Sequence, residues 1–198
     1  MTKLKLTIAT LLLSSFAIAQ KTSQVFESIE THLSDYESIA LEIWNLAEMG
    51  YQEYQSSNLL KARLESEGFS ITTGVAEIPT AFVAEYGTNG PVIGILGEFD
   101  ALPGLSQKAV PFKESANAIG GHGCGHHLFG TASLAAAVAL KDWLIKTKTE
   151  GRIRFYGTPL KREVEQRFTC LVPGFSMTSM WFYTGIREPL TKQMKLLH

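Results

Sequence analysis

The chain has 198 residues, of which 45% are hydrophobic and 19% are charged, and its formal net charge at pH 7 is −1. This length suits one domain of ordinary size, and the composition is that of a globular protein. Because the charges nearly cancel, nothing in the composition favours nucleic acid or an anionic membrane surface as a partner.

The first residues have the three parts of a secretory signal peptide. Lys3 and Lys5 supply a basic start, residues 6–16 form an apolar run, and residues 17–19 are Ala-Ile-Ala. The apolar run is too short to cross a membrane. We therefore predict that residues 1–19 are cleaved and that the product is exported to the periplasm or the extracellular space, with no stable membrane association afterwards. An uncleaved amphipathic start is the alternative.

Helical and extended patterns then follow one another along the chain. Residues 23–47 and 51–67 have apolar residues at roughly helical spacing, which predicts two helices. Residues 69–73 and 80–86 have the composition of strands, and the second is followed by the turn sequence Gly-Thr-Asn-Gly at 87–90.

The segment 91–99 is an almost continuous apolar run, which predicts a buried central strand. A polar loop follows to Gly121, and residues 128–144 and 151–156 have the patterns of an apolar helix and of a further strand. Helices and strands therefore intermix around at least one buried strand. We expect an α/β fold in which helices pack on a mixed central sheet.

The most informative segment is Gly-His-Gly-Cys-Gly-His-His at 121–127, just before the apolar helix. Glycines let the chain turn sharply, and Cys124 and His126 are ligand types that suit a divalent metal at a strand-to-helix junction. The positive N-terminal end of the helix would favour a thiolate at Cys124. The alternative is a glycine-rich turn with solvated histidines and an ordinary thiol.

Asp100 directly follows the predicted buried strand. In sheets flanked by helices, functional groups gather at the carboxyl ends of strands, so Asp100 is a candidate catalytic residue. The alternative is that Glu98 and Asp100 cap the turn that contains Pro103.

Five segments of the sequence are similar to segments of a known family. They are residues 43–48, 78–82, 97–103 (Gly-Glu-Phe-Asp-Ala-Leu-Pro), 121–126 and 157–159 (Gly-Thr-Pro). They resemble the aminoacylase/carboxypeptidase G family of metallopeptidases. Within it, the chain looks most like the branch of aminobenzoyl-glutamate hydrolase and related amidohydrolases. The resemblance covers about residues 26–159.

The resemblance implies hydrolysis of an amide bond in an N-acyl amino acid or an aminobenzoyl-glutamate-like substrate, at a centre of two divalent metal ions, zinc or manganese. By the same resemblance, Cys124 and His126 correspond to metal ligands, and Asp100 belongs to the same site region. In such a centre a metal-held water loses a proton near neutral pH, and a Glu acts as general base. Nucleic acid is not expected, and a homo-oligomer is possible for the intact enzyme only.

Beyond Pro159 the sequence departs from the family, which continues with Ala-Glu-Glu and a glycine-rich stretch where this chain has Leu-Lys-Arg at 160–162. A one-base shift of the reading frame turns the codons of residues 180–183, Met-Trp-Phe-Tyr, into codons that must encode Val-Val-Leu. The next codons then permit His-Trp-His-Pro, as in the family. We therefore predict a frameshifted tail over 160–198 and an incomplete metallopeptidase catalytic domain over 20–159.

This prediction has a consequence for function. A frameshifted product keeps Cys124 and His126 but lacks the general-base Glu and the later ligands, whereas a catalytic zinc normally has three protein ligands. We therefore expect the chain itself to be inactive. Cys170 would also be an accident of the frame, which weakens the idea of a disulfide with Cys124.

Two other functions stay open. One is a non-catalytic remnant or a weak metal-binding module. The other is a thiol hydrolase with Cys124 as nucleophile and His122 or His126 as base.

Overall fold

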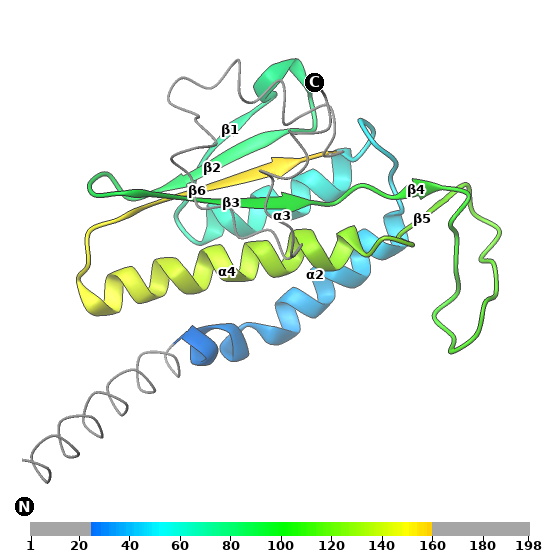
Figure 1. The fold of residues 1–198 in the computed structure, drawn as a ribbon, viewed down its shortest axis with the longest axis horizontal. Helices are drawn as coiled ribbons and strands as arrows, with labels where there is room; N and C mark the ends of the chain where they lie inside the picture. Colours follow the sequence, from blue (N-terminus) through cyan, green and yellow to red (C-terminus); the bar gives the residue numbers. More distant parts are fainter. Residues whose placement is uncertain (1–24, 160–198) are drawn as a thin grey trace, which may run out of the picture.

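The computed structural model describes residues 25–159 of the chain. The predicted signal peptide, residues 1–19, and the predicted frameshifted tail, residues 160–198, lie outside the described residues, so both stay predictions. The described part has a four-stranded sheet with helices packed against one side of it (Figure 1). The predicted α/β fold, with helices on a mixed sheet, is confirmed.

Helical residues 25–31 end in a turn at His32, and three longer helices follow, α2 (Leu33–Leu46), α3 (Tyr54–Ser66) and α4 (His126–Thr147). The helices predicted at 51–67 and 128–144 are confirmed with different ends, whereas the helix predicted at 23–47 is interrupted by the turn at His32. α3 begins at Tyr54 rather than at residue 51, because the backbone of Tyr51 has a φ of 68°, a left-handed conformation that a helix does not contain. α4 extends the predicted helix 128–144 at both ends.

The sheet consists, in spatial order, of β1 (Ser70–Thr73), β2 (Phe82–Tyr86), β6 (Arg152–Thr158) and β3 (Val92–Glu98). β2 is antiparallel to both β1 and β6, whereas β3 and β6 are parallel, from Val92 opposite Arg152 to Glu98 opposite Thr158. Parallel neighbours need a long crossover connection, and α4 supplies it. Within the loops, β4 (Leu102–Pro103) pairs with β5 (Gly120–Gly121), and η1 (Val75–Glu77) is a single 3-10 turn.

The prediction that 91–99 forms a central strand is wrong for the described sheet, in which β3 is an edge strand. The strand is nevertheless buried from Gly94 to Glu98. An apolar sequence indicates that both faces of a strand are buried. It does not indicate whether the strand has a hydrogen-bonded neighbour on one side or on both. The apolar run therefore predicted the burial of β3 and not its place in the sheet.

The main hydrophobic core lies between the sheet and the helices, and it contains four phenylalanines, Phe69, Phe82, Phe99 and Phe155. The ring of Phe82 stacks on Phe155 with a centroid distance of 5.7 Å. Both rings lie where a glycine has no side chain, since a Cβ at Gly97 would come within 2.5 Å of Phe155 and a Cβ at Gly157 within 2.1 Å of Phe82. Packing alone therefore requires a glycine in each of the strand ends that carry family motifs.

α4 runs antiparallel to β3 and lies between the sheet and α2, with Leu134, Ala137 and Val138 buried (Figure 1). The helix is long and apolar enough to cross a membrane by length and composition, but these buried residues give it the position of a core helix. Close to its first turn, a Cβ at Gly130 would lie 2.5 Å from the carbonyl oxygen of Glu98. The start of α4 therefore touches the end of β3.

Candidate functional site

A cluster of two carboxylates and one imidazole forms where β3 ends and α4 begins, and we call Glu98, Asp100 and His126 the carboxylate–histidine cluster. The Nδ1 atom of His126 lies 2.8 Å from Oδ1 of Asp100, and its Nε2 atom lies 3.0 Å from Oε2 of Glu98. Asp100 is fully buried and Glu98 is nearly so. The imidazole of His126 is thus held from both sides by buried carboxylates.

This environment determines the charge of His126. The hydrogen bonds to Asp100 and then to Glu98 raise the pKa of His126 to about 10, against the opposing effect of its burial. His126 is therefore a cation at neutral pH, paired with two carboxylates. The Oε1 atom of Glu98 is buried without a hydrogen-bond partner in the described part of the chain, so this carboxylate retains an unused acceptor.

The two neighbouring histidines have the opposite environment. His122 is 3% exposed and His127 is 9% exposed, and both rings lie against Trp44, with centroid distances of 6.3 and 4.9 Å. The Nε2 atom of His122 lies 3.0 Å from the carbonyl oxygen of Ile43, so Nε2 carries the hydrogen. Burial lowers the pKa of His122, and burial followed by the nearby His122 and His126 lowers the pKa of His127 to about 4. The alternative of solvated histidines is therefore wrong for this pair.

Cys124 lies in the turn before α4, is exposed, and forms no disulfide within residues 25–159. Within residues 25–159, its sulfur makes no hydrogen bond to His126 or to Glu98. The other cysteine considered for a disulfide, Cys170, lies outside the described residues. The structure thus brings His126 and Asp100 together and leaves Cys124 at the surface of the same turn.

The donor set fits a metal only in part. In the described residues, no group of three or more His, Cys, Asp or Glu side chains is arranged to hold a metal ion. The thiol of Cys124 and the imidazole of His126 are suitable donors, but a catalytic zinc normally has three protein ligands. Residues 25–159 therefore do not by themselves supply three ligands for a metal, and the metal roles of Cys124 and His126 and the catalytic role of Asp100 stay predictions.

The geometry does not favour a thiol hydrolase. Such an enzyme needs a hydrogen bond between its nucleophile and its base. In the described residues, both ring nitrogens of His126 face carboxylates, and Nε2 of His122 faces a backbone carbonyl. Neither histidine is positioned as a base for Cys124.

The structure adds Glu98 to the predicted site residues. Glu98 and Asp100 are two residues apart at a strand end, and alternation along a strand would have placed them on one side. That signal was available, but capping of the turn near Pro103 explained both residues equally well. The observed partner of the Glu98 carboxylate is His126.

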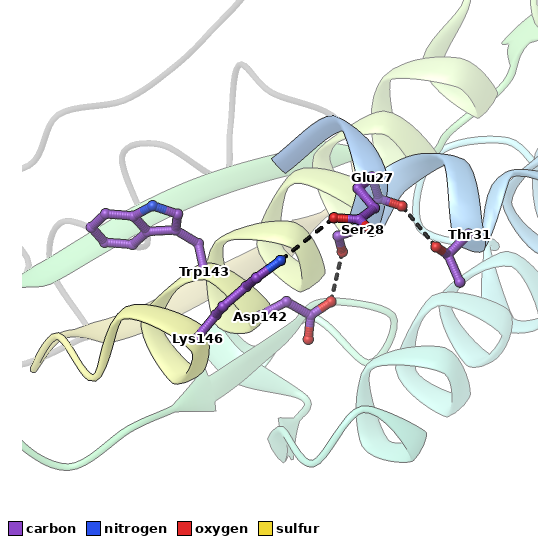
Figure 2. A pocket seen from close by; sticks show the side chains of 6 residues that line it. All are labelled: Glu27, Ser28, Thr31, Asp142, Trp143 and Lys146. Atoms are coloured by element: carbon purple, nitrogen blue, oxygen red, sulfur yellow. Dashed lines mark hydrogen bonds and ion pairs between the residues drawn. The ribbon is translucent and has the colours of Figure 1, made fainter. Parts of the chain in front are cut away.

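A pocket of about 180 Å³ lies elsewhere, between helical residues 25–31 and the C-terminal part of α4, and it is lined by Glu27, Ser28, Thr31, Asp142, Trp143 and Lys146 (Figure 2). Its polar groups satisfy one another, since the Ser28 hydroxyl donates to Asp142 at 2.6 Å and Lys146 pairs with Glu27 at 3.5 Å. It lies about 24 Å along α4 from His126. None of the predicted site residues lines this pocket, so it is not the candidate site.

No family model matches the chain. Several curated proteins do, and two of them follow. The chain is 46% identical over 135 residues to a subunit of the p-aminobenzoyl-glutamate hydrolase of Escherichia coli (strain K12), a match that covers 67% of this chain and 28% of that protein. It is 33% identical over 114 residues to N-acetylcysteine deacetylase of Bacillus subtilis (strain 168), a match that covers 57% of this chain and 29% of that protein.

Among solved structures, an aminohydrolase structure from methicillin-resistant Staphylococcus aureus superposes with a TM-score of 0.59 at 20% identity, over 71% of this chain and 35% of that one. This likeness shows a shared fold. The chain spans less than a third of the length of the two curated relatives named above. The sequence identity, the fold and the motifs agree, and the chain belongs to the M20 peptidase and amidohydrolase family, the aminoacylase/carboxypeptidase G metallopeptidases that its motifs resemble.

Proposed function

We propose that this chain derives from a metal-dependent amidohydrolase that cleaves the amide bond of an N-acyl amino acid or of an aminobenzoyl-glutamate-like substrate. The observation that carries the proposal is the carboxylate–histidine cluster at the end of β3, beside the Cys124 turn. The 46% identity to part of a p-aminobenzoyl-glutamate hydrolase supports the substrate class.

In this proposal Cys124 and His126 supply two metal ligands, and the other ligands come from sequence that the described residues do not contain. A bound zinc or manganese ion would supply Lewis-acid chemistry at the amide carbonyl. With a metal bound, one of the two carboxylate contacts would have to give way: Asp100 would hold Nδ1 of His126, as a carboxylate commonly holds a ligand histidine, and Nε2, which faces Glu98 in the structure, would lose its proton to bind the ion.

We further propose that the chain as written is inactive, because residues 160–198 are out of frame and replace the general-base Glu and the later ligands. A loss of the base alone lowers the rate by about 100- to 10,000-fold. The second candidate, a non-catalytic remnant or weak metal-binding module, is favoured by one observation, which is that no group of three ligands exists within residues 25–159.

The test compares the full chain with a version in which one base is restored near the codon of Pro159. We expect the restored protein, loaded with zinc or manganese, to hydrolyse p-aminobenzoyl-glutamate or an N-acetyl amino acid, and the original chain to show no turnover above background. His126→Ala should abolish the restored activity, whereas Glu85→Gln, at an ion pair with Arg154, should preserve it. Robust turnover by the original chain, or none by the restored protein, would contradict the proposal.

Export is a separate part of the proposal. Expressed with its own N-terminus in a bacterial host, the protein should appear in the periplasm or medium with Gln20 as its first residue. Mass spectrometry of the fractionated protein measures this directly, and a cytoplasmic protein with residues 1–19 intact would contradict it.

A further inference from the structure

The loop between α2 and α3, residues 47–53, lies beside the end of β3 that carries the candidate site (Figure 1). The N–H of Ala101 donates to the carbonyl oxygen of Glu48 at 2.7 Å, and Met49 forms a parallel bridge with Ala101. Asp100 immediately precedes Ala101, so the loop holds the peptide that follows the candidate catalytic residue.

Two carboxylates hold this loop in place. Glu48 caps the start of α3 by accepting the N–H of Ser56 at 2.8 Å and its hydroxyl at 2.7 Å. Glu53 accepts the N–H of Tyr51 at 2.9 Å through Oε1 and the hydroxyl of Thr80 at 3.0 Å through Oε2. Glu53 therefore joins the α2–α3 loop to the segment before β2.

The contacts of Glu53 are buried and local to the site. Glu53 and Asp100 are both fully buried, and Thr80 is nearly so. The loop backbone is left-handed at Ala47 and Tyr51, with φ of 45° and 68°, a conformation that residues other than glycine seldom adopt. The acceptor that Glu53 offers to the N–H of Tyr51 stabilises this conformation.

We propose that Glu53 is a positioning residue of the candidate site, which holds the 47–53 loop and, through that loop, the orientation of Asp100 toward His126. A role of Glu53 in catalysis rests on the proposed function, whereas its contacts with the loop do not depend on that function. Burial raises the pKa of Glu53 to about 7, and the nearby charge of Asp100 contributes in the same direction.

The experiment uses the full chain without metal or substrate and compares Glu53→Ala with Glu53→Gln. In Glu53→Ala we expect the amide hydrogen of Ala101 to exchange about tenfold faster or more, because a buried anchor of the loop is lost. The amide hydrogen of Phe155, in β6, should change less. The imidazole nitrogen resonances of His126 should shift as its contact with Asp100 loosens.

Glu53→Gln keeps an oxygen for the N–H of Tyr51 and an amide group for Thr80, so it should restore most of both signals. Glu67→Ala is the matched control. Glu53 directly precedes α3 and Glu67 directly follows it, and Glu67 forms ion pairs with Arg63 and Lys141. It should lower overall stability without a selective change at Ala101 or His126.

Equal acceleration at Ala101 and Phe155, or unchanged His126 resonances in Glu53→Ala, would overturn the inference. If Glu53→Ala does not fold, Thr80→Val removes only one donor to Glu53 and should give a smaller change of the same kind. The absence of that change would also overturn it. None of these measurements depends on turnover, so an inactive restored enzyme would refute the proposed function and leave this inference standing.

Discussion

His126 and the pair formed by His122 and His127 lie within a few residues of one another, yet they have opposite environments. His126 lies between two buried carboxylates, which raise its pKa to about 10. His122 and His127 pack on Trp44 and on each other, and burial lowers the pKa of both. The comparison teaches that residue type and spacing do not determine the charge of a histidine, because the contacts of each ring do.

The largest expected effect that tests this comparison is a loss of stability in mild alkali. The folded pKa of His126, about 10, is above its ordinary value of 6.5, so its stabilising effect is full below pH 6.5 and disappears as the pH rises toward 10. This contribution is on the order of 3–5 kcal/mol, from the size of the pKa shift. Urea unfolding across this pH range measures it.

Asp100→Asn is the matched variant for that measurement, since it keeps the shape of Asp100 and removes one of the two charges beside His126. The fall in stability between pH 6.5 and 10 should become shallower, and the pKa of His126 followed by NMR should move down by about 1–3 units. An unchanged NMR titration of His126 would show that the carboxylates do not control its charge.

A smaller effect of opposite sign is expected from His127. Its folded pKa, about 4, is below the ordinary value of 6.5, so its stabilising effect is present above pH 6.5 and is lost as the pH falls toward 4. The expected loss is about 2–3 kcal/mol. A glutamine at position 127 cannot take up a proton. As the pH falls from 6.5 to 4, the difference in unfolding free energy between His127→Gln and the parent should therefore become smaller. A constant difference would contradict the prediction.

The smallest expected effect concerns Trp44, whose ring shields His122 and His127 from water. Trp44→Leu removes the ring that contacts both His122 and His127, at a cost of about 1 kcal/mol in unfolding free energy. Water should then reach both imidazoles, and their pKa values should rise toward 6.5, while the pKa of His126 stays unchanged. NMR titration of all three histidines in one sample provides the measurement and its internal control.

Much of the fold was accessible from the sequence because periodicity reports burial. The spacing of apolar residues predicted the helices and strands, and the segments 97–103 and 121–126 led to the family. The start of α3 was not accessible, because it depends on the left-handed backbone of Tyr51. The edge position of β3 was missed because burial of its faces hides the number of its neighbours.

For the candidate site, the sequence predicted which residues lie near one another, but not which side chains contact each other. Asp100 and His126 were expected in one place, and they are in contact. From the sequence, Glu98 could be either a cap of the turn or a site residue. Its contact with His126 in the structure places it in the cluster. The role of Glu53 had no sequence signal, because its partner Thr80 is 27 residues away and only the folded chain brings them together.

Gly130 limits which sequences can build this site. It lies one helical turn after His126, and a methyl group on it would overlap the carbonyl oxygen of Glu98, at 2.5 Å. Substitution by alanine would move the first turn of α4 outward, and because His126 reaches both carboxylates from that turn, both contacts would lengthen together. Mutational screens of this region should therefore find position 130 as intolerant as the polar residues, although it has no side chain with which to bind or react.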